Sequence, residues 1–196
     1  VVIHGPVWDA ANAAALGRAE DDGLTYVHPF ADPRVIAGQG TAAVEFLADV
    51  PALDVLLIAV GGGGLLAGVA TAAAHLKPSL RVIGVEPVGA ATLHDSMAAG
   101  RPVQLAEITT RAGSLAPRQS TSVNLNLIQA HCEGIVLVDD AAMLAAARWL
   151  WAELGIAAEM AAAGIAALAE GRVGGLDGAQ VGVLVCGAGA DGIVAA

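Results

Sequence analysis

The stretch LLIAVGGGGLLAGVA, residues 56–70, places four consecutive glycines between two apolar runs. Glycine loses more backbone freedom on folding than any other residue, so four together weaken a regular helix or strand. The apolar run Val55–Val60 predicts a buried strand, and Leu65–Leu76 predicts a helix. The glycines are therefore predicted to form the turn from that strand into that helix.

A turn made only of glycine exposes its main chain to a ligand. Its consecutive N–H groups can point toward one place, and no Cβ blocks a close approach. The N-terminus of the following helix adds roughly half a positive charge. A turn that only packs a helix against a sheet usually needs one or two glycines. We therefore predict that Gly61–Gly64 form a nest for a phosphate group.

The composition excludes several classes of protein. The chain has 196 residues, of which 56% are hydrophobic and 14% charged, so it is neither disordered nor of low complexity. Its net charge is −10 and its positive residues are scattered, which predicts no nucleic-acid or anionic-membrane partner. A membrane helix over the uncharged residues 55–74 would carry the four glycines at its centre, each costing about 1 kcal/mol relative to alanine. We predict no membrane span.

Cysteine usage and the first residues point to one compartment. Cys132 and Cys186 are far apart and have no CxxC spacing, which predicts a reduced, cytoplasmic environment. The first residues lack the basic start of a signal peptide and carry Asp9 early, in agreement with that localisation.

Apolar runs alternate with alanine-rich stretches at helical spacing, and several runs are apolar throughout, as in parallel strands covered on both faces. This predicts an α/β fold of three layers, a mostly parallel sheet with helices on both faces. Residues 101–126 are predicted to form a long functional loop. The predicted strands are Val1–His4, Thr25–Val27, Val55–Val60, Arg81–Glu86, Ile135–Val138 and Val181–Cys186. The predicted helix faces are Ala37, Thr41, Val44 and Ala48, and Met143, Ala147, Leu150 and Leu154.

A nicotinamide cofactor is an alternative occupant of the turn. Residues 62–67 satisfy the loose pattern GxGxxA, and Glu86 ends the next predicted strand, where an acid would bind a ribose. The alternative function is thus that of an NAD-binding Rossmann-type oxidoreductase domain. That pattern, however, normally opens a domain on its first strand, and here more than fifty residues precede it. Four glycines also satisfy almost any glycine pattern.

Longer motifs decide between the two cofactors. VHPFADPRVIAGQGTAAVEFL (27–47), the four glycines, RVIGVEP (81–87) and VLVCGAGAD (183–191) follow one another in this order. Together they closely resemble the pyridoxal-phosphate dehydratases of fold type II, the threonine and serine ammonia-lyases and serine racemase. SLAPRQ (114–119) is similar to the bacterial threonine/serine dehydratase branch. The resemblance implies a tryptophan synthase β-like fold and a lyase that converts L-threonine or L-serine to a 2-oxo acid and ammonia.

The resemblance also assigns residues to the cofactor. It implies that the glycines and the Leu65 amide hold the phosphate of pyridoxal 5'-phosphate, and that Cys186 faces its pyridine nitrogen. A thiol is a neutral hydrogen-bond partner for that nitrogen, which suits elimination of a β-hydroxyl group. Taken alone, Cys186 would be interpreted as a small buried hydrophobe. Glu159 matches a glutamate near the cofactor, or else caps a helix or faces solvent. The glycines in question are Gly61, Gly62, Gly63 and Gly64.

A divalent cation is a further implication. Glu86 matches an acidic residue that binds such a cation in some family members, together with the backbone carbonyl at Ala90. The third ligand there is usually acidic, whereas this chain has Thr92. Because a hard cation needs several oxygen ligands, the other interpretation of Glu86 is a strand-end residue in a solvated turn.

The motifs that would supply catalysis are missing. The family attaches its cofactor to a lysine in an N-terminal motif like SFKxRG, and a later SxGNH segment grips the ring; neither is present. The one lysine, Lys77, is predicted to be an exposed loop residue, so no catalytic residue is assigned. Residues 1–23 are expected to be the last strand and helix of a small domain, and residues 24–196 most of the large cofactor-binding domain.

We therefore expect a C-terminal portion that is inactive alone and homo-oligomeric when full length. Departures from the family near the cofactor, including the loss of an aspartate beside Ser114 and of a proline after Glu159, indicate a divergent member. A non-catalytic remnant that binds a phosphorylated ligand is the remaining alternative.

Overall fold

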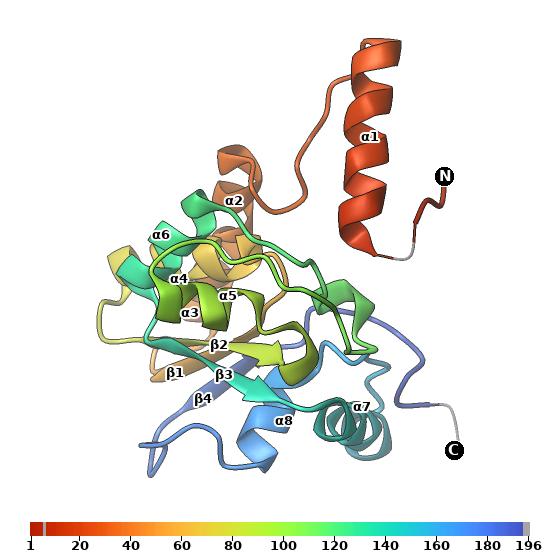
Figure 1. Cartoon of the computed structure of the whole chain (residues 1–196). Coiled ribbons are helices and arrows are strands. Elements are labelled where there is room, and N and C mark those ends of the chain that lie inside the picture. The colour runs from red at the N-terminus through yellow and green to blue at the C-terminus, as the bar shows by residue number, and fades with distance from the viewer. Residues whose placement is uncertain (6, 194–196) are drawn as a thin grey trace.

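A computed structural model describes residues 1–5 and 7–193, so the last three residues of the predicted large domain lie outside the described part. A parallel sheet at its centre is covered by helices on both faces, which confirms the predicted three-layer α/β fold (Figure 1). Along the sheet the strand order is β3-β2-β1-β4. The strands are β1 (Val55–Ala59), β2 (Arg81–Pro87), β3 (Gly134–Val138) and β4 (Val181–Leu184).

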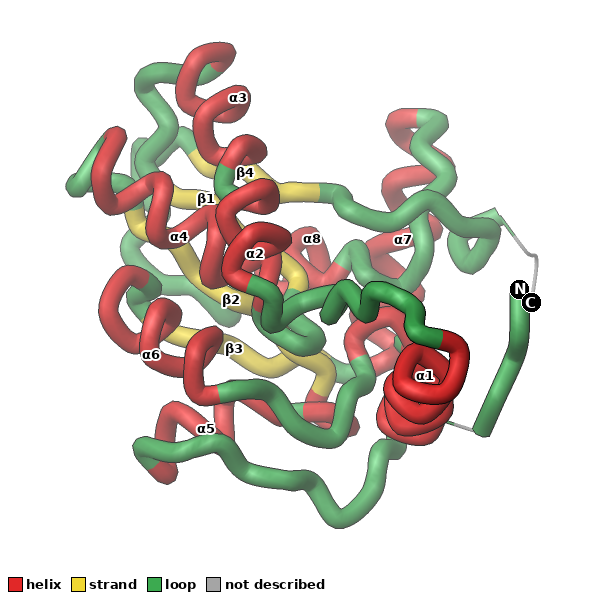
Figure 2. The backbone as a smooth tube through the Cα atoms, turned by 90° about the horizontal axis from the view of Figure 1, so that it is seen from above, coloured by secondary structure: helices red, strands yellow, loops and turns green. Residues whose placement is uncertain are grey.

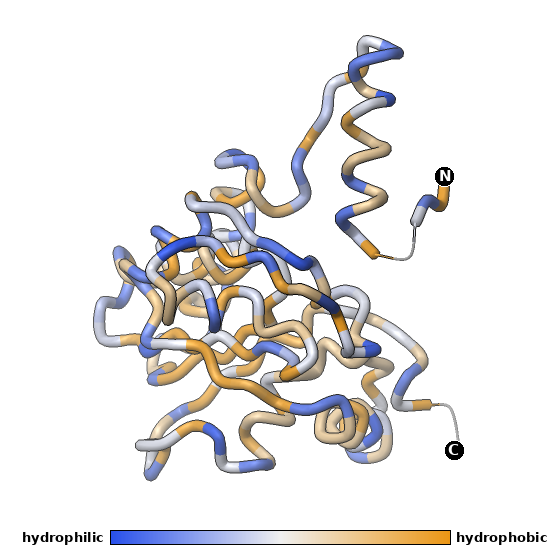
Figure 3. Tube along the Cα trace, viewed as in Figure 1, coloured by the Kyte–Doolittle hydropathy of each residue, from blue (hydrophilic) through white to orange (hydrophobic). Residues whose placement is uncertain are grey.

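Two apolar clusters hold the layers together, one on each face of the sheet. Leu56 and Ile58 of β1 face α2, α3, α4 and α6, whereas Leu57 and Ala59 face α7 and α8. The apolar residues of the strands accordingly run through the interior of the molecule (Figure 3). The helices are α1 (Trp8–Asp22), α2 (Pro33–Gln39), α3 (Thr41–Asp49), α4 (Gly64–Leu76), α5 (Thr92–Ala99), α6 (Ser122–His131), α7 (Asp140–Leu154) and α8 (Ala163–Ala169).

The order of the strands creates a crevice at one end of the sheet. From β1 the chain crosses to β2 and then to β3 over one face, and returns over the other face, through α7 and α8, to β4 on the far side of β1 (Figure 2). In such sheets ligands bind outside the carboxyl ends of the strands where the order reverses. Here that place lies between β1 and β4, whose paired residues Ile58 and Leu184 are among the last in each strand. Gly61 and Cys186 are thereby brought to the same edge.

The predicted helical face over Ala37, Thr41, Val44 and Ala48 is wrong, because two helices share this stretch. The break falls at Gly40, which approaches α4 closely: a Cβ there would lie 3.0 Å from the Gly68 carbonyl oxygen. Val44 is left 50% exposed. The predicted face of α7 is confirmed for its buried members Met143, Ala147 and Leu150, whereas Leu154 is exposed.

Two predicted strands, Val1–His4 and Thr25–Val27, are not strands. Within residues 1–5 and 7–193 neither run pairs with a strand, and a β-strand needs a neighbour to satisfy its main chain. The helix between them, α1, buries no residue and stands apart from the body (Figure 1). It is joined to the body at its start, where the Trp8 ring lies 4.7 Å from the Phe30 ring.

The predicted long loop is largely present, but α6 begins at Ser122 and a short 3-10 turn occupies Gly113–Leu115. Among the described helices, none is long and apolar enough to cross a membrane.

Candidate functional site

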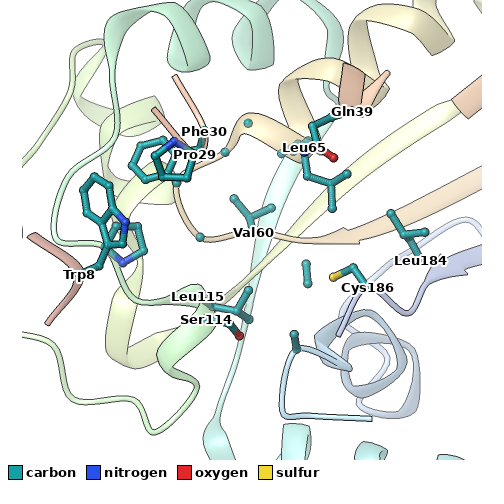
Figure 4. Close-up of a pocket in the computed structure, with 18 of the residues that line it drawn as sticks. Trp8, Pro29, Phe30, Gln39, Val60, Leu65, Ser114, Leu115, Leu184 and Cys186 are labelled. Carbon is teal, nitrogen blue, oxygen red and sulfur yellow. The ribbon is translucent and has the colours of Figure 1, made fainter. Parts of the chain in front are cut away.

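A cavity of about 600 Å³ opens at the carboxyl ends of β1 and β4. The turn of residues 61–65 forms one wall, and Leu184, Cys186 and Glu159 form another. In Figure 4, Trp8 and Phe30 close one end, while Cys186 lies at the other. The crevice predicted by the strand order is therefore a real cavity, and the glycine turn lines it.

The amides of this turn are free to bind a ligand. Among the described residues, no acceptor pairs with the N–H groups of residues 61–65; the first backbone bond of the helix runs from the Ala67 amide to the Gly63 oxygen, at 2.8 Å. Four N–H groups at a helix start lack partners in any α-helix, and together they favour an anion. The donor set fits the phosphate of pyridoxal 5'-phosphate, and phosphate binding by these residues stays a prediction.

The glycines also have a packing role, against Phe30 at one end of the cavity. A Cβ on Gly62 would lie 2.4 Å from the Phe30 ring, and one on Gly64 would lie 2.6 Å from the Phe30 carbonyl oxygen. Gly63 has a φ of 88°, which side chains rarely adopt. Close packing and ligand access thus both require glycine here, so the two interpretations of the turn do not exclude each other.

Two polar side chains behind the turn had no signal in the sequence. Ser120 Oγ donates to the Gly62 carbonyl oxygen at 2.8 Å, and Asn124 Nδ2 donates to the same oxygen at 2.7 Å. Asn124 Nδ2 also donates to the Phe30 oxygen at 2.8 Å. Ser120 lies in the stretch interpreted as a loop, and Asn124 is one of two asparagines at the start of α6, so composition alone could not single them out.

Cys186 lines the cavity after β4 and is exposed, so it is not a small buried hydrophobe. The protein around the thiol still removes part of its hydration, which raises its pKa, and the negative charge of Glu159 adds to the rise. Glu159 is held beside it, because its amide donates to the Gly187 oxygen at 3.1 Å. The two side chains therefore meet at the cavity wall, with the thiol neutral at physiological pH.

Glu86 does not lie in a solvated turn, and that interpretation is wrong. Its side chain is fully buried, and its two oxygens accept hydrogen bonds from the Leu93 amide at 2.9 Å and the His94 amide at 2.8 Å. Burial raises the pKa of its carboxyl to about 8, against the opposing effect of these two amides. The carboxyl group thus caps the start of α5.

The surroundings of Glu86 do not fit a divalent cation. Thr92, in place of an acidic ligand, donates its hydroxyl hydrogen to the Pro117 oxygen at 2.8 Å. In residues 1–5 and 7–193 no group of three or more His, Cys, Asp or Glu side chains could hold a metal. Beside the buried Ala90, one carboxyl group with both oxygens already hydrogen-bonded offers too few ligand atoms for a hard cation. Glu86 is also absent from the cavity lining, so it cannot reach the ribose of a dinucleotide there.

Lys77 lies at the opposite end of α4 from the glycine turn. It is half-buried rather than exposed, because its ammonium group donates to the Pro51 oxygen at 2.9 Å and the Leu53 oxygen at 2.6 Å. These contacts tie it to the loop before β1 and keep it away from the cavity.

A parallel α/β sheet whose switch point carries amides without partners among the described residues is the arrangement found in domains that bind phosphorylated small molecules. Residues 1–187 match the family described as pyridoxal-phosphate dependent enzyme, and the chain belongs to this family. The resemblance found in the motifs and the identity of the cofactor are thereby confirmed, and the nicotinamide alternative receives no support.

Named relatives agree with this assignment. The chain is 39% identical to the phenylserine dehydratase of Ralstonia pickettii, over 87% of this chain and 53% of the relative. It is 38% identical to the L-threonine ammonia-lyase of Geobacter sulfurreducens, over 94% of this chain and 46% of the relative. Among solved structures, threonine deaminase isoform 2 of Solanum lycopersicum superposes with a TM-score of 0.86 at 33% identity, covering 96% of this chain and 55% of that one. The chain thus spans about half the length of the curated relatives it matches.

Proposed function

We propose that this chain is the large-domain part of a pyridoxal-phosphate-dependent dehydratase that converts L-threonine or L-serine to a 2-oxo acid and ammonia. The observation that carries the proposal is a row of amides at residues 61–65 that have no partner in the described part of the chain and line a cavity at the switch point of the sheet. Family membership and the names of the relatives support the reaction class. Both named relatives act on amino acids with a hydroxyl group on the β-carbon, as threonine and serine have.

Each wall of the cavity has its own part in this proposal. The amides of Gly61, Gly62, Gly63, Gly64 and Leu65 bind the phosphate. Cys186 offers a neutral thiol to the pyridine nitrogen, since its pKa is raised. When bound, the cofactor supplies an electron sink for the α-carbon of the substrate. A thiol leaves that sink weaker than a carboxylate would, which favours loss of the β-hydroxyl group over other fates.

We further propose that the covalent anchor of the cofactor comes from outside these 196 residues. Lys77 is engaged by two carbonyl oxygens at the far end of α4, so the chain has no lysine at the cavity. The chain alone is then inactive, residues 1–23 belong to a small domain, and the whole enzyme is a cytoplasmic homo-oligomer. The two free cysteines suit a reducing compartment.

Ligand titration of the chain tests the proposal. Pyridoxal 5'-phosphate should bind saturably, as followed by the 31P NMR signal of its phosphate, and NAD should not compete. With cofactor and L-threonine present, no 2-oxo acid should form. Saturable NAD binding, or turnover at enzymatic rates, would contradict the assignment. A lysine motif followed by SxGNH in the codons upstream of Val1 would exclude the remnant alternative.

A further inference from the structure

We propose that Asn124, assisted by Ser120, is a positioning residue that orients the phosphate-binding amides from behind the glycine turn. The inference rests on the proposed function, because it concerns the same cradle. Neither residue lines the cavity, so neither touches the ligand itself.

The contacts of Asn124 tie three segments together. Its Nδ2 group bridges the Gly62 oxygen at 2.7 Å and the Phe30 oxygen at 2.8 Å, and Ser120 Oγ adds a second donor to the Gly62 oxygen. The loop of Phe30, the glycine turn and the start of α6 are therefore held by one side chain. Its amide orientation is fixed, since both partners are carbonyls and only the nitrogen can donate to them.

Fixing the Gly62 carbonyl also fixes the next amide. No peptide bond among the described residues is cis. In a trans peptide the carbonyl of one residue and the N–H of the next point in opposite directions. With the Gly62 oxygen held toward α6, the Gly63 N–H is directed to the other side of the turn, where the cavity lies. A turn of four glycines has many other conformations available, so this restraint selects the binding one.

The burial of Asn124 indicates that it is not there for stability alone. The residue is completely buried, yet its Oδ1 atom has no hydrogen-bond partner among the described residues. A buried acceptor without a partner destabilises the folded state, whereas an apolar residue would avoid that loss. The side chain is therefore explained better by what its nitrogen holds in place.

Binding measurements on the 196-residue chain test the role of Asn124. We compare Asn124→Ala with Asn126→Ala, an exposed asparagine on the same helix, using pyridoxal 5'-phosphate, inorganic phosphate and the phosphate-free analogue pyridoxal. Loss of one directed amide should weaken both phosphate-containing probes about tenfold and leave pyridoxal within about twofold. The 31P signal of the bound cofactor should also shift. Asn126→Ala should change none of these.

The outcomes separate this inference from the proposed function. Equal weakening of pyridoxal and its phosphate, or no weakening, would reduce Asn124 to a structural residue and overturn the inference. If the unaltered chain binds neither phosphate probe, the cradle itself is wrong and both proposals fall. If Asn124→Ala does not fold, Ser120→Ala decides: we expect about threefold weaker binding of the phosphate-containing probes only, and equal effects on all three probes would overturn the inference.

Discussion

The two walls of the cavity offer different groups to a ligand: one offers main chain and the other offers side chains. The wall after β1 presents main chain, and it is enclosed: a Cβ on Gly64 would meet the backbone of Phe30 at 2.6 Å. The wall after β4 presents the side chains of Cys186, which follows the strand, and Glu159, from the loop between α7 and α8. Strand β4 itself is only half-buried and has one neighbour in the described sheet.

This difference predicts what each wall can tolerate. Main-chain donors cannot be exchanged for other chemistry, so the β1 wall is suited to the constant part of a cofactor, its phosphate. Side-chain donors can be replaced one at a time, so the β4 wall is where chemistry at the ring is tuned. Substitutions on the first wall should weaken both folding and ligand binding, and substitutions on the second should change ligand binding with little effect on folding.

The largest effect is expected for Gly64→Ala. Its Cβ would meet the Phe30 oxygen and the Phe30 Cα at 2.6 and 2.8 Å, and the backbone cannot move aside without opening the turn. Overpacking of this kind costs about 3 kcal/mol, and binding of pyridoxal 5'-phosphate should be lost. The matched control is Gly38→Ala in α2, where a Cβ meets nothing within 4 Å. Thermal unfolding should show no destabilisation of the Gly38→Ala variant. Equal destabilisation of both variants would contradict the close packing inferred for the β1 wall.

A second effect, at a residue packed behind the β1 wall, should appear in the pH dependence of the free energy of unfolding. Glu86 holds the amide of Leu93, whose side chain packs where a Cβ on Gly63 would lie. The pKa of the Glu86 carboxyl rises from 4.5 to about 8 on folding, so the folded state is stabilised when this group is protonated. This contribution to the free energy of unfolding is fully present below pH 4.5 and is lost as the pH rises through 8. Glu86→Gln should remove this loss, which amounts to about 2 kcal/mol between pH 6 and 7.5 at about 1.4 kcal/mol per pH unit. Chemical denaturation across this range measures it, and parallel stability curves for both proteins would contradict it.

On the β4 wall, Gly187→Ala should be far milder than Gly64→Ala, although its Cβ would lie only 2.1 Å from Glu159 Oε1. The obstacle consists of side-chain atoms alone, Oε1, Cδ and Cγ of Glu159, and this side chain can rotate, so we expect destabilisation of about 1 kcal/mol or less. The displaced carboxylate should change the affinity for pyridoxal and for its phosphate by the same factor. A loss of stability as large as that of Gly64→Ala would show that the walls do not differ.

The smallest effect on stability is expected for Cys186. Because its pKa is raised above the ordinary 9.0, the thiolate fraction at neutral pH is lower than that of a free cysteine. In a Cys132→Ser background, labelling by a disulfide reagent should be slow at pH 7 and should rise with a midpoint above pH 9. Cys186→Ser should leave the melting temperature and phosphate affinity unchanged. Rapid labelling at pH 7 would contradict a neutral thiol.

What could be predicted from the sequence follows the same division. Strand β1, the glycine turn and α4 were predictable because an apolar run, four glycines and a helical repeat are all local signals. The split of α2 from α3 at Gly40 was not, because it depends on contact with Gly68 of a distant helix. The strand expected at Val1–His4 failed for a related reason, since its pairing depends on a neighbour that the residue pattern does not reveal.

The site shows this limit more clearly. Gly61 and Cys186 came from motifs. Ser120 and Asn124 instead hydrogen-bond to the Gly62 carbonyl oxygen, and Asn124 also to that of Phe30, contacts that no residue pattern reveals. The burial of Glu86 was missed as well, because the amides that surround it belong to α5, whose place at the end of β2 only the fold determines.

Because Trp8 lies in the cavity wall, its intrinsic fluorescence can report ligand binding. Indole emission overlaps the near-ultraviolet absorption of a pyridoxal ring, and energy transfer falls steeply with distance. The other two tryptophans, Trp149 and Trp151, are surface residues of α7 and lie outside the cavity lining. Binding of the cofactor in the cavity should therefore be measurable as quenching of the Trp8 fluorescence, without any label attached to the protein.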